Sequence, residues 1–413
     1  MRFIRNWRWL YATSPLVVVV ACEQSLDRVT APNNAQLHGS LRAEAAIAGT
    51  VVPVAGVEQL YAAVNDVANA GVAIVMEPGT YILSATSAGG AARANAGRLE
   101  LQPNMSLYGV AGNRSAVIID ARALPTSSFN VSFGRTAPVR IGRGSNTVEW
   151  LTILAPPTAA AGIATEIAGT PTTRIRVAHV FAGGASRGVD IRNVGASMIG
   201  RQIEAEVVDN EFAGPVEVIG MSEGIRVSNF VGANNGVIVA TTSENRAYGF
   251  QIGCILANNR SSNASIRVRS SGDRFYDNAL GCLIIGGLNQ ATTGVANGNS
   301  TTLEAHGTKF VDNTAVLGFR SGGVQVVGGR STVQTNAASN NVVSVSLWGS
   351  KSEGNLGENF EVFGAWMEAL TGVSGTGNQV TVQLHGVSKQ IDVSATASLP
   401  LDPGNTNVAT IIR

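Results

Sequence analysis

The sequence predicts an all-β solenoid, and three observations support that prediction. Of the 413 residues, 48 are glycine, whereas only 6% are aromatic and 14% are charged. Such a composition is typical of many short strands joined by turns. In addition, a short segment that begins with phenylalanine and ends in an alternating apolar strand recurs along the chain. The net charge of +1 argues against a nucleic-acid binder.

The first residues have the features of an export signal. Arg2, Arg5 and Arg8 give a basic start, and an apolar run that ends at Val20 follows. The run is too short to cross a bilayer stably. The string Val-Val-Ala-Cys at 19–22 resembles the bacterial lipobox, which implies that residues 1–21 are a lipoprotein signal peptide and that Cys22 is lipidated. The alternative is an ordinary signal peptide with a chance cysteine.

The lipobox interpretation predicts where the mature protein resides. Acyl chains on Cys22 would anchor it to a bacterial membrane in the cell envelope, with the rest folded outside the cytoplasm, in the periplasm or at the cell surface. Residues 22–50 are polar and alanine-rich and lack apolar periodicity, so we expect a flexible tether there. No later stretch is long and apolar enough for a transmembrane helix.

A helix and several short strands follow the tether. Apolar residues recur at helical spacing from Val57 to Val67, and Gly71 stands where a C-terminal cap belongs. The strings EPGTYIL at 77–83, LELQPNMSLYGVAG at 99–112 and AVIIDA at 116–121 then alternate strands with turns. Together these segments resemble the N-terminal cap and first coils of the right-handed parallel β-helix proteins, the pectate-lyase-like superfamily. The resemblance implies a parallel β-helix over 51–395, with 396–413 as a C-terminal cap or tail.

The phenylalanine-led repeat supports a solenoid of about a dozen coils. Its spacing is unequal, as expected when core strands are fixed and loops vary in length. We expect the phenylalanines to stack from rung to rung inside the coil, and asparagines at the bends to form a ladder. The phenylalanines are Phe181, Phe212, Phe230, Phe275 and Phe310, and the asparagines are Asn210, Asn259, Asn278 and Asn313.

Cys254 and Cys282 are 28 residues apart, which is close to one coil, and both follow glycine on an apolar strand. Stacked on adjacent rungs, they would be within reach of a disulfide, which an oxidising compartment permits. Unbonded thiols that pack as small apolar groups are the alternative. Trp348, Trp366, Tyr248 and Tyr276 could stack on sugars if exposed, with burial as the alternative.

Residues that point outward from the strands after each bend are the candidates for a functional site. Approximate phasing places seven residues in one outward column: Asp190, Glu217, Ile238, Arg267, Leu283, Arg320 and Glu361. Asp190 and Glu217 would lie on neighbouring rungs, with Arg192 beside Asp190. The two carboxylates could bind calcium or act as an acid/base pair, with Asp190, Glu217 and Arg192 as catalytic residues. A solvated face with incidental charges is the alternative.

A second acidic group, Glu204, Glu206, Asp209 and Glu211, alternates along one strand and its bend. An exposed edge is one interpretation of it, and a cation site is the other. No further cofactor is predicted.

The catalytic motifs of known β-helix enzymes can be compared residue by residue. The chain lacks the adjacent aspartates, Gly-His-Gly and Arg-x-Lys of polygalacturonases, and also the Asp-His signature of calcium-dependent pectate lyases. We therefore expect a membrane-anchored protein that binds an extracellular polysaccharide or surface polymer without catalysis. A polysaccharide lyase or glycoside hydrolase, and a structural or adhesive rod, are the alternatives. An enzyme should have a groove walled by the loops near 121–138 and 286–300, whereas a rod should have a flat face.

Overall fold

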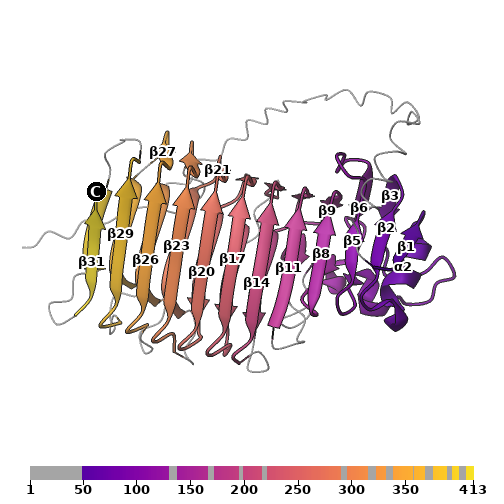
Figure 1. Cartoon of the computed structure of the whole chain (residues 1–413), viewed down its shortest axis with the longest axis horizontal. Coiled ribbons are helices and arrows are strands. Elements are labelled where there is room, and N and C mark those ends of the chain that lie inside the picture. The colour runs from indigo at the N-terminus through magenta and orange to yellow at the C-terminus, as the bar shows by residue number, and fades with distance from the viewer. Residues whose placement is uncertain are drawn as a thin grey trace, which may run out of the picture.

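A computed structural model gives the fold of most of the chain (Figure 1). It describes residues 49–129, 137–165, 172–194, 199–215, 221–289, 295–314, 322–331, 338–356, 358–367, 375–387, 393–399 and 406–413. Cys22, the signal peptide at 1–21 and nearly all of the tether at 22–50 lie outside the described residues. Within the described part, no helix is long and apolar enough to span a bilayer.

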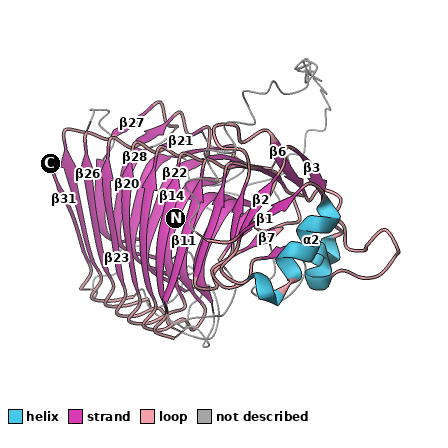
Figure 2. Ribbon diagram, turned by 45° about the vertical axis from the view of Figure 1, so that its right-hand side comes forward, coloured by secondary structure: helices cyan, strands magenta, loops and turns pink. Residues whose placement is uncertain are grey.

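Three parallel sheets wind around one lumen (Figures 1 and 2). The twelve-stranded sheet contains β1 (Val51–Val54), β2 (Ala73–Met76), β5 (Ser106–Tyr108), β8 (Ser145–Glu149), β11 (Thr172–Ala178), β14 (Gln202–Val208), β17 (Val237–Ser243), β20 (Ser265–Ser271), β23 (Ser300–His306), β26 (Val342–Trp348), β29 (Gln379–His385) and β31 (Val408–Ile412). The nine-stranded sheet contains β3 (Gly79–Ile82), β6 (Val117–Asp120), β9 (Thr152–Leu154), β12 (Phe181–Gly183), β15 (Glu211–Ala213), β18 (Arg246–Tyr248), β21 (Arg274–Tyr276), β24 (Lys309–Val311) and β27 (Lys351–Glu353). The ten-stranded sheet contains β4 (Leu99–Glu100), β7 (Val139–Arg140), β10 (Ile163–Ala164), β13 (Arg187–Val194), β16 (Glu223–Phe230), β19 (Ile252–Asn259), β22 (Leu280–Asn289), β25 (Gly322–Ser331), β28 (Glu358–Met367) and β30 (Val393–Leu399).

The chain visits the three sheets in the same order in successive coils, and each strand pairs with strands of the coils before and after it. Every strand pair in the three sheets is parallel, for example β14 with β17 and β16 with β19. The expected right-handed parallel β-helix is therefore confirmed. The predicted boundary between 395 and 396 falls inside β30, and β31 adds a further strand to the twelve-stranded sheet.

The lumen is filled by alternate side chains of the strands, as period-two patterning requires. Phe212, Phe275 and Phe310 are buried in this core, and the rings of Phe275 and Phe310 stack with centroids 5.7 Å apart. The expected stacking is wrong for Phe181 and Phe230, which lie outside the core. In β12 the central residue, Ala182, faces the lumen instead of Phe181. Ala182 is the register partner of Phe212, and register partners on parallel strands point to the same side of a sheet.

Asparagines form hydrogen-bonded ladders at the corners between sheets. Asn278 and Asn313 belong to one ladder, in which Asn278 N–H donates to the Asn313 side-chain oxygen at 3.2 Å. Asn210 belongs to another, in which its amide donates to Asn245 at 2.9 Å. A longer ladder joins four buried asparagines at a third corner: Asn299, Asn341, Asn378 and Asn407. These ladders satisfy buried backbone groups where the chain turns.

The helix α2 (Val57–Asn65) lies at the N-terminal end of the solenoid and buries Leu60, Tyr61 and Val64 against the first coil (Figure 2). This agrees with the expected capping helix. The helix ends earlier than Gly71 would suggest, because the Asp66 side chain accepts a hydrogen bond from Ala68 N–H and starts a short 3-10 turn. Two further 3-10 turns span Ala94–Gly97 and Thr126–Ser128.

Cys254 and Cys282 are register partners on β19 and β22, as their spacing predicts. Both are buried free thiols, so the structure realises the unbonded alternative and not the disulfide. A hydrogen bond with Cys282 and burial raise the pKa of the Cys254 thiol well above its ordinary value.

Candidate functional site

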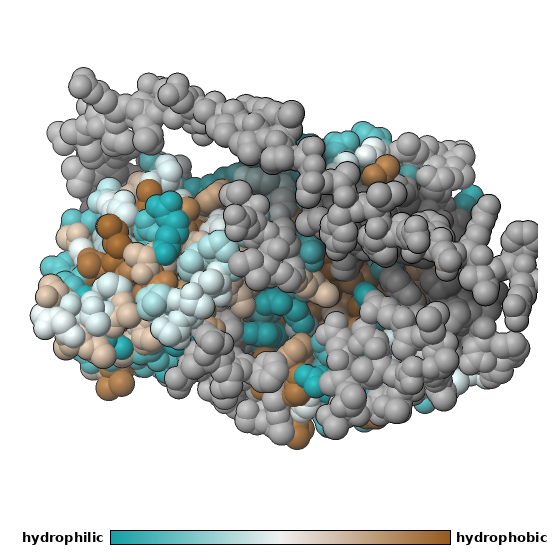
Figure 3. All heavy atoms as spheres, turned by 180° about the vertical axis from the view of Figure 1, so that it is seen from behind, coloured by the Kyte–Doolittle hydropathy of each residue, from teal (hydrophilic) through white to brown (hydrophobic). Residues whose placement is uncertain are grey.

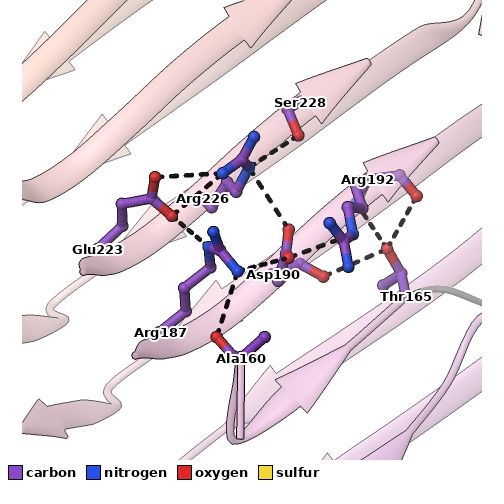
Figure 4. Close-up of polar contacts among 8 residues, drawn as sticks. All are labelled: Ala160, Thr165, Arg187, Asp190, Arg192, Glu223, Arg226 and Ser228. Atoms are coloured by element: carbon purple, nitrogen blue, oxygen red, sulfur yellow. Dashed lines mark hydrogen bonds and ion pairs between the residues drawn. The ribbon is translucent and has the colours of Figure 1, made fainter. Parts of the chain in front are cut away.

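A cluster of charged residues lies on two neighbouring strands of the ten-stranded sheet, β13 and β16. In this sheet Asp190 of β13 pairs with Arg226 of β16, and Arg187 pairs with Glu223 (Figure 4). All four side chains, together with Arg192, are largely or completely buried. Gly188 and Gly224, the second residues of these two strands, lie where the backbone comes close to the lumen. A Cβ on Gly188 would lie only 2.4 Å from the ring of Phe212.

Glu223 is the best-paired carboxylate of this charged cluster. It accepts a hydrogen bond from Arg187 Nε and two from Arg226 Nη1, at 3.1 and 3.2 Å. Burial disfavours its ionised form, but Arg187 and Arg226 outweigh burial and lower the pKa of Glu223. Glu223 is therefore a buried anion that fixes two guanidinium groups.

Asp190 lies between three guanidinium groups but is less well bonded. The nearest nitrogens of Arg192, Arg187 and Arg226 are 3.2, 3.8 and 3.9 Å from its oxygens. Neither oxygen of Asp190 receives a hydrogen bond of good geometry from a described residue. Burial raises the pKa of Asp190 despite the attraction of Arg187 and Arg226.

Arg192 is held by its backbone as well as by Asp190. Its N–H donates to Thr165 Oγ1 at 2.7 Å, and the same hydroxyl donates to Arg192 O at 3.2 Å. Burial, with the nearby positive charge of Arg226, lowers the pKa of Arg192 to about 9. The guanidinium carbons of Arg192, Arg226 and Arg260 lie 5.8, 5.3 and 6.0 Å from the ring centroid of Phe230.

An open hollow of about 460 Å³ lies beside this cluster. Its lining comprises Thr126, Phe129, Pro157, Thr158, Ala160, Ser186, Arg187 and Met221. Arg187 connects the hollow to the cluster, since its Nη1 also donates to Ala160 O at 3.3 Å. Seen from behind, hydrophilic and hydrophobic residues are mixed over the coloured part of the surface (Figure 3). The loop expected to wall a groove, 121–138, contributes Thr126 and Phe129, whereas no described residue of 286–300 lines the hollow.

The sequence-predicted site is only partly assembled. Asp190 and Arg192 do lie side by side, but both are buried and not on a solvated face. Glu217 lies outside the described residues, and the carboxylate next to Asp190 on the neighbouring strand is Glu223. The surroundings of Asp190 do not favour calcium there, because guanidinium groups lie on three sides of the carboxylate and would repel a cation. Among the described residues, no group of three or more potential metal-ligating side chains is found.

The outward column also needs correction. Asp190, Leu283 and Glu361 do share one row of the ten-stranded sheet, joined through Arg226, Ile255 and Gln325. Ile238 and Arg267 instead belong to the twelve-stranded sheet, where Ile238 faces the lumen. Arg320 lies outside the described residues.

Glu223 and Arg226 were not singled out by sequence reasoning, although a signal was present. The strings Gly-Val-Asp-Ile-Arg-Asn at 188–193 and Gly-Ile-Arg-Val-Ser-Asn at 224–229 share a glycine, two alternating apolar residues and a final asparagine. Aligning them places Arg187 opposite Glu223 and Asp190 opposite Arg226, as the register has it.

The second acidic group lies on β14, in the middle of the twelve-stranded sheet, and at the bend and strand that follow it, and its carboxylates have basic partners. Glu204 and Glu206 pair with Arg174 and Arg176 of the neighbouring strand, at 2.8 and 2.6 Å. Asp209 contacts His179, and Glu211 pairs with Arg114 at 2.5 Å. These ion pairs argue against a cation site, and the expected edge is wrong because β14 is paired with a strand on each side.

No protein-family model matches the chain, and no curated protein matches it in sequence. Several solved structures do match. Pectate lyase Pel9A is 12% identical over 87% of this chain and 82% of its own, with a TM-score of 0.38. The A-module of Azotobacter vinelandii mannuronan C-5 epimerase AlgE4 is 14% identical over 86% and 100%, with a TM-score of 0.35. The catalytic domain of a GH87 α-1,3-glucanase is 11% identical over 88% and 68%, with a TM-score of 0.37. Similarities at this level carry no information about reaction or site residues.

Proposed function

We propose that this protein is a cell-envelope lipoprotein whose β-helix binds an extracellular polysaccharide or another surface polymer without cleaving it. The hollow beside Arg187 is the observation that supports binding. Its lining combines the ring of Phe129 and the apolar Pro157 and Met221 with hydroxyl groups and one guanidinium. Mostly apolar walls with a few placed polar groups are typical of small-ligand and sugar sites.

The chemistry of the lining supports binding over catalysis. Among its described residues there is no carboxylate, histidine, tyrosine or lysine to act as a general acid or base. Arg187 is a poor base. Burial alone would lower its pKa, but Glu223 and Asp190 raise the pKa of Arg187 above its ordinary value, which keeps the guanidinium charged. Asp190 and Glu223 are fully buried, so neither can contact a polymer without rearrangement.

Arg192 supports a second candidate function, a polysaccharide lyase. A lyase needs a base to remove a proton beside a carboxyl group, and a pKa of about 9 brings Arg192 nearer to that role. However, Arg192 is only 5% exposed, so a polymer cannot reach its guanidinium readily, and binding without cleavage remains the first proposal.

The test uses the full chain and a panel of immobilised polysaccharides that includes polygalacturonate and a neutral glucan. We expect retention on at least one of them, with neither an unsaturated product nor new reducing ends. Thr158→Trp at the exposed rim should weaken retention at least tenfold, because the bulky indole would obstruct the opening of the hollow. Thr241→Trp on the exposed face of β17 is the matched control and should bind normally.

Three outcomes would change the proposal. An unsaturated product that disappears in Arg192→Gln would establish the lyase. Retention that Thr158→Trp leaves intact would move binding away from the hollow. Neither retention nor product on any polymer would favour a structural rod and overturn the binding proposal.

Membrane anchoring is tested separately. In a bacterial host fed a labelled fatty acid, we expect the chain to incorporate label and Cys22→Ser to lose it. An unlabelled wild-type chain that is still exported would indicate an ordinary signal peptide.

A further inference from the structure

A row of cations runs along the outer face of the nine-stranded sheet. Arg246 of β18 pairs in register with Arg274 of β21, Arg274 with Lys309 of β24, and Lys309 with Lys351 of β27. Side chains at equivalent positions of successive parallel strands point to the same side, about 4.8 Å apart from rung to rung. The four cations therefore form a straight ladder of like charge roughly 15 Å long. β21 and β27 mark its course along one edge of the solenoid (Figure 2).

Three of these four cations have no ion-pair partner among the residues that the structure describes. Lys351 pairs with Glu353, but Arg246, Arg274 and Lys309 are exposed and form no ion pair with any residue that the structure describes. The carboxylate at the start of the row, Glu211, is already occupied by Arg114 and by the Tyr248 hydroxyl at 2.9 Å.

The twelve-stranded sheet shows that this arrangement is not a consequence of the fold. There, neighbouring rungs place Arg174 against Glu204 and Arg176 against Glu206, so that opposite charges alternate. Like charges directly opposite each other destabilise a sheet. The cation ladder thus lowers the stability of the free protein, and an external anion would reverse that effect.

The shape of the surface restricts the anion. Each strand here is only three residues long, and its central residue points inward, so the outer face is two side chains wide. Beside the cations, the second row holds Tyr248 and Tyr276, whose rings stack with centroids 5.1 Å apart. A guanidinium lies over one of them, since Arg274 Cζ is 4.5 Å from the ring centroid of Tyr276.

We propose that this cation ladder binds a linear anionic polysaccharide, one that carries carboxylate or sulfate groups along a single chain. A narrow, straight row of charges fits one extended polymer, whose anionic groups can accept hydrogen bonds from the guanidinium and ammonium groups. A duplex nucleic acid would need a broader basic surface than this strip. The ladder lies on a different sheet from the hollow, so the two surfaces can be tested apart.

The test measures binding of the full chain to polygalacturonate and to dextran sulfate at two salt concentrations, with uncharged dextran alongside. If all four cations displace counter-ions, a fourfold rise in salt should weaken binding roughly 50-fold, by analogy with single-stranded polyanions. In the double variant Arg274→Gln/Lys309→Gln, the same rise in salt should weaken binding only about 7-fold. The control, Arg267→Gln/Arg269→Gln, removes the same charge from the exposed face of β20 and should behave as the wild type.

Four results would overturn the proposal. The first is that neither anionic polymer binds at low salt. The second is that the ladder variant and its control weaken binding equally, which would indicate an effect of net charge. The third is that uncharged dextran binds as well as the anionic polymers. This would refute binding through the cation ladder but would still be consistent with binding through the hollow. The fourth is that single-stranded DNA binds as tightly as the polysaccharides and that the ladder variant loses as much affinity for it. The ladder would then bind polyanions in general and not a polysaccharide in particular.

Discussion

Glu223→Gln should destabilise this protein far more than Asp190→Asn, although both remove one negative charge from the same buried cluster. Glu223 holds two guanidinium groups through three hydrogen bonds, and its side chain is completely buried. Breaking a buried ion pair by removing one partner typically costs about 3–5 kcal/mol. An amide keeps one weaker acceptor, so we expect Glu223→Gln to cost roughly 3 kcal/mol of unfolding free energy.

Asp190 is predicted to matter less because its oxygens receive no well-formed hydrogen bond from the described residues. Its pKa is raised by burial, so the ionised form gains little from the fold. Replacing it by the isosteric amide should cost about 1 kcal/mol or less. The measurement is urea unfolding followed by circular dichroism at neutral pH, and the two midpoints are compared with the wild type.

The pH dependence of the two variants provides a second measurement. The pKa of Glu223 is lowered, so its contribution to stability is present above its ordinary value of 4.5 and is lost as the pH falls through the lower folded value. The pKa of Asp190 is raised, so its contribution is present below 3.8 and is lost as the pH rises through the folded value. The penalty of Glu223→Gln should therefore fade on acidification. If Asp190→Asn proves the more damaging at neutral pH, the assignment of Glu223 as the anchor of the cluster is refuted.

Further predictions concern the lumen and the corners. Asn341→Ala removes three side-chain hydrogen bonds of the asparagine ladder and should cost about 3 kcal/mol of unfolding free energy. Ser344→Ala, on the strand β26 that follows Asn341, should change stability by less than about 0.5 kcal/mol. Equal urea midpoints for the two variants would contradict the ladder. Phe275→Ala should cost about 3–5 kcal/mol and Phe181→Ala much less, since only Phe275 is in the core; thermal melting of both variants checks the register. The Cys254 thiol should react with a thiol reagent at least about 100-fold faster in urea than in the folded protein, and rapid labelling without urea would show that the lumen opens there.

The solenoid could be predicted from the sequence because its signals are repeated in many coils. Composition, the alternating strands and the strings at 77–83 and 99–112 all indicate the same architecture. The spacing of Cys254 and Cys282 even gave the correct register of β19 and β22. Whether the two thiols join could not be deduced, because reach alone does not decide between a disulfide and two packed thiols.

The charged cluster was harder to predict because each coil contains strands from three sheets. Treating the strand after Phe230 as equivalent to the strand after Phe181 mixed the twelve-stranded with the ten-stranded sheet, which brought Ile238 into an outward column with Asp190. A shift of one residue then reverses which side chains face the lumen. Gly188, the second residue of β13, and Gly224, the matching residue of β16, were better markers of register than phenylalanine, because a Cβ at either position would collide with the lumen.

The outer faces of the three sheets differ in how their charges are balanced, and this difference indicates which face would attract a charged partner. Opposite charges alternate across rungs on the twelve-stranded sheet, which leaves little net attraction for a charged partner. On the ten-stranded sheet, Glu223 and Asp190 are buried against guanidinium groups, and only Arg187 reaches the hollow. On the nine-stranded sheet, the cation ladder repeats like charges from rung to rung, and among the described residues its ion-pair partner is Glu353. Since one backbone architecture supports all three arrangements, the unbalanced one reflects the choice of side chains, and it is the face where an anionic partner would stabilise the protein most.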